Sequence, residues 1–397
     1  MKKALKYIKN NIVHMDKLLL FFSVVLAIVG LFSIVSASTR ESVITYNLTL
    51  YHYFEQHLIM LSIACLGGFI IINVPTKNYK WIAPLLYIVV LGLIIATFFI
   101  GDDVGRGNNN WLPIGGFKFQ PSELAKPVII VMTSILFSAL YKPLRNINNN
   151  KRGRGILVII ITMGLIPFAV YKLQGDLGTT LIILAIVGVL LLASPLLRND
   201  KLLIFGIGGI TALLWIGGSL LFGGSGLSSS QTERFSEFWD PCNNYTDNGY
   251  QVCNAIIAIN NGGLQGRGPG KSQQKYSYIP DPHTDMIFSI IAEERGVLGC
   301  TIIFILMFYI INKILILANV ANTISNKYIC LGVATYMMAH IFVNLGGLFA
   351  VIPLTGVPLP FLSYGGTFTI SFICSLAIVQ RIHIESKIEY EKKKANA

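Results

Sequence analysis

Ionisable side chains at the edge of a long apolar segment are candidates for function, because holding charge at a membrane boundary is costly. Asp285 is the clearest candidate: it follows His283 and Thr284 and stands directly before a long apolar run. A carboxylate there could act as a general base and accept the proton of a weak nucleophile. It could equally serve structure, since Thr284 or Asp285 could cap the first backbone N–H groups of the following helix.

Two more acids, Glu293 and Glu294, lie about two helical turns beyond Asp285. Helical spacing puts one of them on the same face as Asp285. Because buried charges are normally paired, we expect a buried ion pair with Arg295 or with a cation of another helix.

Basic side chains gather in the segment that precedes Asp285. They are Arg234, Arg267, Lys271 and Lys275. Such cations suit an anionic group such as a pyrophosphate. They could also be solvated loop charges that are balanced by Glu233, Glu237, Asp240 and Asp247. Spacing alone leaves both interpretations open.

A second polar group opens the apolar run at residue 121. Glu123 and Lys126 are three positions apart, so they can pair on one helix face, and we expect a structural ion pair. Trp111, shortly before them, could be an ordinary membrane-interface residue, because indole favours the head-group layer. Asp176, at the head of another apolar run, is explained as a helix start.

Residues 353–367 combine prolines and glycines with apolar residues and Ser363. Irregular backbone at membrane depth is tolerated only where it is buried in protein or lines a cavity. A cavity near the outer leaflet is therefore expected here.

The six cysteines fall into two groups. Four lie in apolar runs, where cysteine behaves as a small apolar side chain and indicates no metal site: Cys65, Cys300, Cys330 and Cys374. Cys242 and Cys253 lie in a long loop that we place outside the cell, where a disulfide between them could persist.

The elements that must position these residues are membrane helices. Of the 397 residues, 53% are hydrophobic and only 13% are charged, far from the composition of soluble domains. The sequence predicts an all-α, polytopic membrane protein that forms one domain over residues 1–397, with about ten helices of spanning length. The expected spans are 17–37, 57–74, 81–100, 121–140, 156–173, 177–195, 202–223, 285–316, 328–350 and 362–380.

Basic residues set the expected orientation. Most of the 31 lysines and arginines fall on the cytoplasmic side when both termini are placed there, which is the positive-inside pattern. The large loop 224–284 is then extracytoplasmic, with residues 249–259 suited to a short helix on the membrane surface. The basic tail 381–397 would meet anionic membrane lipid, so the net charge of +12 does not indicate nucleic acid.

Together these segments resemble the SEDS family (shape, elongation, division and sporulation), the FtsW and RodA proteins that polymerise peptidoglycan. The resemblance covers most of the chain and is carried by five ordered motifs: Trp111 with Phe119 to Glu123, Gln174 to Thr179, Gly249 to Gln251, His283 to Phe288 with Glu293 and Glu294, and Pro358 to Gly366. Residues 272–280 look closer to the FtsW branch of division and sporulation. Asp281-Pro282 replaces the usual Glu-Ala, Met286 the usual Phe, and Gly175 the usual Pro.

The resemblance implies a glycosyltransferase that joins lipid II into glycan strands and releases undecaprenyl pyrophosphate. Asp285 matches the family's candidate general base. The implied substrate contacts are Trp111, Arg234, Arg267, Lys271, Lys275, His283 and Ser363. A divalent cation, Mg²⁺ or Mn²⁺, could bridge Asp285 and the pyrophosphate, although no metal site made from protein ligands alone is evident in the sequence.

The resemblance also implies a class B penicillin-binding protein, a transpeptidase, and other division proteins as partners. Two other functions remain open on the sequence. A lipid II flippase would need no catalytic base, although the intramembrane polar sites and repeats of many transporters are sparse here. A scaffold would only recruit the penicillin-binding protein.

Overall fold

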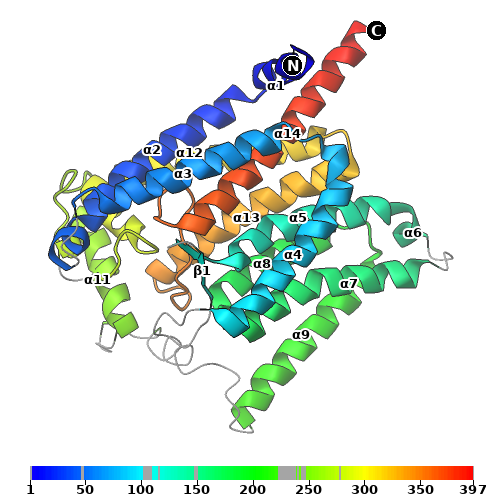
Figure 1. The fold of residues 1–397 in the computed structure, drawn as a ribbon. Helices are drawn as coiled ribbons and strands as arrows, with labels where there is room; N and C mark the ends of the chain where they lie inside the picture. The colour runs from blue at the N-terminus through cyan, green and yellow to red at the C-terminus, as the bar shows by residue number, and fades with distance from the viewer. Residues whose placement is uncertain are drawn as a thin grey trace.

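The computed structural model describes residues 2–45, 49–101, 110–114, 117–146, 151–221, 238, 241–242, 247–276 and 279–396. Helices dominate these residues (Figure 1). The α-helices are α1 (Lys2–Val13), α2 (Lys17–Arg40), α3 (His52–Ile72), α4 (Tyr79–Ile100), α5 (Pro121–Ala139), α6 (Tyr141–Arg145), α7 (Arg152–Ala169), α8 (Leu177–Ala193), α9 (Arg198–Leu221), α11 (Asp247–Gly262), α12 (Ile287–Val320), α13 (Ile324–Leu348) and α14 (Gly366–Ala395).

Short elements complete the fold. Two π-helical turns continue α2 and α7, and they are η1 (Glu41–Thr45) and η3 (Val170–Gln174). Two 3₁₀ turns are η2 (Thr76–Asn78) and η4 (Gln274–Tyr276). The strands β1 (Leu112–Ile114) and β2 (Phe117–Phe119) pair antiparallel before α5.

Each of the ten predicted apolar spans coincides with a helix, and the all-α membrane class is confirmed. Among the described residues, eight helices are long and apolar enough to cross a membrane, against the ten that we expected. The two others are α8, which has only 17 residues, and α9, whose side chains are described only in part.

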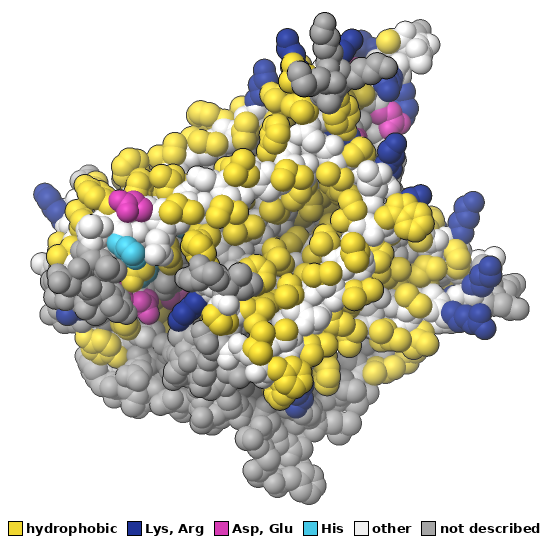
Figure 2. All heavy atoms as spheres, viewed as in Figure 1, with side chains coloured by type: hydrophobic (Ala, Val, Ile, Leu, Met, Phe, Trp, Pro, Cys, Tyr) yellow, Lys and Arg dark blue, Asp and Glu magenta, His cyan; other side chains and the backbone are white. Residues whose placement is uncertain are grey.

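The centre of the bundle is formed by α5, α13 and α14, with α8 and α12 against α13 (Figure 1). In the apolar stretches of α5, α13 and α14, 67%, 61% and 72% of the residues are buried. In the corresponding stretches of α2, α3 and α4, the buried shares are 28%, 17% and 28%. The outer helices therefore expose apolar side chains, which cover the face shown in Figure 2. Such a surface suits contact with lipid tails.

Local sequence accounts for several helix starts. The Asp16 carboxylate accepts hydrogen bonds from the backbone N–H groups of Leu18 and Leu19 at the start of α2. Asp176 accepts one from Thr179 at the start of α8, which confirms its interpretation as a helix start. Pro121 occupies the first turn of α5, where its missing N–H costs nothing.

Helix α12 is broken at Gly296, whose φ of 65° is in the left-handed region that glycine tolerates. The loop after α11 enters this break. Val297 and Leu298 donate their N–H groups to the carbonyls of Gly263 and Leu264, at 2.9 and 3.1 Å. In return, the carbonyls of Glu293 and Glu294 accept hydrogen bonds from the N–H groups of Arg267 and Gly268. The loop thus supplies the backbone partners that the helix lacks.

The predicted helix near residues 249–259 is present as α11, but its setting differs from the one that we expected. Its buried side chains, among them Val252, Ala255 and Ala258, belong to a helix that packs against α12. The apolar side chains of α11 therefore pack against another helix of the protein, where we had expected contact with the membrane surface.

Candidate active site

Asp285 lies just before the start of α12 without capping it. The first residue of α12 is Ile287, and its N-cap is Met286, which makes no side-chain cap hydrogen bond. The carboxylate of Asp285 instead accepts a hydrogen bond from the hydroxyl of Thr284, at 2.8 Å. The capping interpretation of Thr284 and Asp285 is therefore wrong, because the N-cap position falls on Met286 and neither side chain accepts a hydrogen bond from a backbone N–H group of α12.

The backbone around Asp285 is held from two other parts of the fold. The side-chain amide of Asn344, on α13, donates to the carbonyl of Asp285 at 2.7 Å and to that of Val357 at 2.7 Å. Tyr364 donates its N–H to the carbonyl of His283 at 2.9 Å. The segment 353–367 is thus tied to the turn before α12, while the cavity expected beside it stays a prediction.

Ser363 and His283 both lie inside the protein. The Ser363 hydroxyl accepts a hydrogen bond from the N–H of Leu359, at 2.7 Å, and only 2% of the residue is exposed. His283 is also 2% exposed and packs between the rings of Tyr53 and Tyr364. Neither side chain presents itself to solvent as a substrate contact would.

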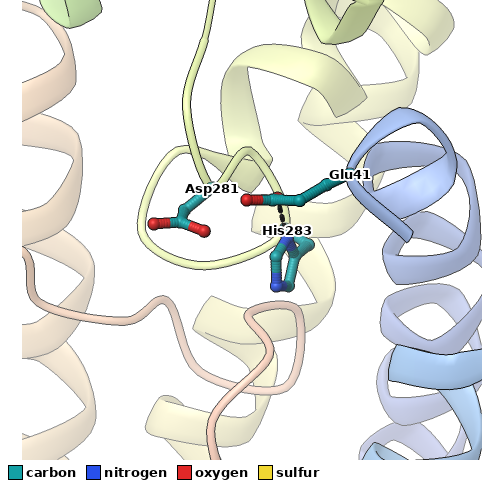
Figure 3. Close-up of side chains that lie close together, drawn as sticks. All are labelled: Glu41, Asp281 and His283. Atoms are coloured by element: carbon teal, nitrogen blue, oxygen red, sulfur yellow. Dashed lines mark ion pairs between the residues drawn. The ribbon is translucent and has the colours of Figure 1, made fainter. Parts of the chain in front are cut away.

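Three ionisable residues from the end of α2 and the turn before α12 form a cluster (Figure 3). Glu41, at the end of the α2 helix, Asp281 and His283 have potential ligand atoms that all lie within 4.8 Å of one another. Burial of the carboxyl group and the neighbouring carboxylate of Glu41 raise the pKa of Asp281 from 3.8 to about 6, although its side chain still reaches solvent.

Sequence reasoning missed this cluster. Asp281 was noted only as a departure from the family pattern, and Glu41 not at all. The available signal was that Glu41 is an acid at the end of the first apolar span, where holding a charge is costly.

Glu293 and Glu294 are buried in ion pairs, but the partners are not those that we expected. Glu293 lies 3.6 Å from Arg267 and accepts a hydrogen bond from the Ser272 hydroxyl at 2.5 Å. Glu294 lies 3.2 Å from the ammonium of Lys275. The expected pairing with Arg295 or another helix is wrong, because the break in α12 admits the loop that carries both cations.

The four basic candidates are therefore in different situations. Lys275 is buried and paired, and its ammonium also donates to the Ser36 hydroxyl and the Gly270 carbonyl. The Arg267 side chain is 32% exposed beside Glu293. Lys271 is exposed. Arg234 lies outside the described residues, as do three of the four acids that could balance it.

Glu123 and Lys126 are in contact inside the bundle. The Lys126 ammonium lies 2.7 Å from Glu123, and both side chains are almost completely buried. The same ammonium lies 3.1 Å from Nε2 of His340, whose Nδ1 is 2.9 Å from the carbonyl of Pro358. This chain of contacts links α5 and α13 to the segment 353–367.

Three further predicted residues, Trp111, Cys242 and Cys253, lie outside the long apolar helices. Trp111 precedes β1 and is half-buried. Cys242 and Cys253 form a disulfide, which joins the second turn of α11 to the chain before the helix.

Known proteins resemble this chain in sequence and in fold. The sequence profile of the FtsW/RodA/SpoVE family, described as cell cycle proteins, matches residues 16–388. The probable peptidoglycan glycosyltransferase FtsW of Bacillus subtilis is 30% identical over 393 residues, covering 98% of this chain and 95% of its own length. Stage V sporulation protein E of the same organism is 26% identical, covering 92% and 96%.

A solved structure has a similar fold. A chain from a work on the structural coordination of polymerization and crosslinking by a peptidoglycan synthase complex superimposes with a TM-score of 0.70 at 23% identity. The match covers 94% of the chain described above and 98% of the other.

Proposed function

Since the chain belongs to the FtsW/RodA/SpoVE family of cell cycle proteins, we propose that it is a peptidoglycan glycosyltransferase of the division or sporulation branch. It would join lipid II units into a glycan strand and release undecaprenyl pyrophosphate. The similarity to the glycosyltransferase FtsW along 98% of the chain supports this activity, and the apolar helices place the chemistry in a multi-pass membrane protein.

The observation that carries the mechanism is the state of Asp285. Its carboxylate is half-buried, caps no helix, and among the described residues accepts a hydrogen bond only from Thr284. It is therefore available to take the proton of a sugar hydroxyl while that oxygen bonds to the anomeric carbon of the second sugar. The bond from that carbon to the pyrophosphate oxygen breaks in the same step. General-base assistance of this kind contributes a factor of about 10²–10⁴.

Cations in the outer loop would balance the charge that develops on the leaving pyrophosphate. Lys271 and Arg267 suit this role best because they reach solvent. Arg234 and Trp111 remain proposed substrate contacts on the basis of the family resemblance. A divalent cation would supply further stabilisation of the leaving group.

Orientation and partners complete the proposal. We place both termini in the cytoplasm, because the basic side chains in Figure 2 gather at the end of the bundle that carries them. There His14 Nε2 lies 3.0 Å from Glu391 Oε2, so the two termini share one side. A class B penicillin-binding protein and division proteins are the partners that the family resemblance implies.

The direct test supplies purified protein in detergent with labelled lipid II, with and without the cognate penicillin-binding protein. Flipping has no meaning without a bilayer, so a flippase yields no product in this assay. A scaffold likewise yields no polymer on its own or with a transpeptidase partner whose polymerase activity is absent. Glycan polymer that is resolved on a gel would support the proposal, and its absence under both conditions would refute it.

A further inference from the structure

We propose that Glu41, Asp281 and His283 form a binding site for one divalent transition-metal ion, Mn²⁺ or Zn²⁺. The site uses protein ligands alone and is separate from the cation that could bridge Asp285 and a pyrophosphate. It stands whether or not the chain polymerises lipid II.

The three ligands converge from two distant parts of the chain. Glu41 lies in the π-helical turn η1 that ends α2, and the other two lie in the turn before α12. Figure 3 shows the two carboxylates and the imidazole directed toward one another. Ligand atoms on opposite sides of an ion are about 4.2 Å apart when each bond is about 2.1 Å. The observed spread of up to 4.8 Å needs only small side-chain movements to close around an ion.

Two buried atoms in this cluster lack a hydrogen bond. Oε2 of Glu41 and Nδ1 of His283 form an ion-pair contact of 3.2 Å whose geometry falls short of a good hydrogen bond, and neither atom has another hydrogen-bond partner among the described residues. Only 2% of His283 is exposed. The centroid of its ring lies 4.1 Å from that of Tyr53 and 5.2 Å from that of Tyr364, and these contacts keep the imidazole from turning away. Buried polar atoms are nearly always satisfied, and a metal ion would satisfy both.

The donor set selects the kind of ion. Imidazole suits Zn²⁺ and carboxylates suit Mn²⁺, whereas Mg²⁺ prefers an octahedral shell of oxygen atoms. One imidazole and two carboxylates therefore favour Mn²⁺ or Zn²⁺ over Mg²⁺. Three protein ligands leave positions open for water or for an anionic group of a substrate.

A bound ion would join two elements that meet beside Asp285. It would fix η1, at the outer end of α2, to the turn that places Asp285 four residues beyond Asp281. The alternative for the same cluster is a simple ion pair between Glu41 and a protonated His283, as the dashed line in Figure 3 marks. That alternative needs no metal, so metal binding separates the two.

The test measures Mn²⁺ binding directly, on full-length protein purified in detergent and freed of metal with a chelator. Electron paramagnetic resonance reports free Mn²⁺, because its six-line signal is broadened when the ion is bound. We expect saturable binding of one ion per chain, competed by Zn²⁺. The variants Glu41→Gln and Asp281→Asn should each weaken binding at least about tenfold, by analogy with losses at metal sites.

Glu55→Gln is the matched control, since Glu55 is an exposed carboxylate in the first turn of α3 and should leave Mn²⁺ affinity unchanged. Because Asp281 reaches solvent, Asp281→Asn keeps a folded protein for the measurement. Non-saturable binding, or binding that all three variants share with the parent, would overturn the site. So would binding that survives Asp281→Asn but is lost in Asp285→Asn. The lipid II assay plays no part in these outcomes.

Discussion

The side-chain amide of Asn344 donates a hydrogen bond to the backbone carbonyl of Asp285 at 2.7 Å, and so joins α13 to the turn that precedes α12. The same amide holds the carbonyl of Val357. The placement of the proposed base therefore depends on a buried residue 59 positions away.

Replacing Asn344 by Leu should affect the positioning of Asp285 without affecting the binding of substrate. The change keeps the branching at Cγ but removes the donor to both carbonyls, and stranding such buried groups costs about 1–3 kcal/mol each. We expect kcat to fall about tenfold or more while KM changes little, because substrate contacts stay in place. Asn344→Gln is the conservative comparison. An unchanged kcat in a destabilised Asn344→Leu protein would assign Asn344 a purely structural role.

Asp285→Asn should abolish polymerisation without unfolding the protein. The amide keeps the shape but cannot accept a proton, so the rate of glycan formation should fall by about 10²–10⁴. Since the side chain caps no helix, the melting temperature should stay close to that of the parent. Polymer yield from labelled lipid II and a thermal melt give the two readouts. A folded variant that polymerises at the parent rate would remove Asp285 as the base.

Glu123→Gln should behave differently, lowering stability and activity together. It leaves the Lys126 ammonium buried without its counter-charge, and breaking such a pair costs about 3–5 kcal/mol. The double variant Glu123→Gln with Lys126→Met removes the stranded charge and should recover most of the stability. Denaturation in mixed detergents measures the difference. Equal stability of the single and double variants would contradict a structural pair.

Asp281 predicts a pH dependence of stability when metal is absent. Its pKa is about 6 in the folded protein and 3.8 ordinarily, so the folded state holds the proton more tightly than the unfolded chain. The resulting stabilisation is complete below about pH 4 and is lost as the pH rises through 6. In chelator, the melting temperature of the parent should therefore fall across this window more than that of Asp281→Asn. Parallel curves for the two proteins would contradict the raised pKa.

Single cysteines at exposed sites should report the orientation. In a chain whose four free cysteines are replaced by Ala, Lys271→Cys should react with a membrane-impermeant maleimide on intact cells. Lys142→Cys, on α6, should react only after the membrane is opened. The parent without added cysteine corrects for background. Reversed labelling of the two positions would invert the orientation and remove the proposed site from the outer face.

The helices were predictable because lipid-facing helices require long apolar runs, and these are visible in the sequence wherever they occur. Contacts between distant residues were not predictable in the same way. Glu293 and Glu294 were expected beside Arg295, but the break at Gly296 brings in Arg267 and Lys275. The spacing of residues around Gly296 in the sequence does not predict a break in the helix.

The proposed site was predictable in part. Asp285 could be identified from its motif and its place before an apolar run. Its freedom from capping could not, since it depends on α12 beginning two residues later. Glu41 meets Asp281 and His283 only through the packing of the folded bundle, and a single sequence carries no record of that proximity.

The exchange of backbone hydrogen bonds at Gly296 restricts where the chain tolerates insertions. A Cβ atom at Gly296 would lie 2.3 Å from the Gly266 nitrogen, and one at Gly266 would lie 2.3 Å from the Glu294 carbonyl oxygen. Residues added ahead of α11 leave this junction untouched. One residue added between positions 263 and 268 moves two hydrogen-bonding carbonyls and two N–H groups out of register at once. The chain can therefore lengthen before α11, but the number of residues between α11 and this junction is fixed.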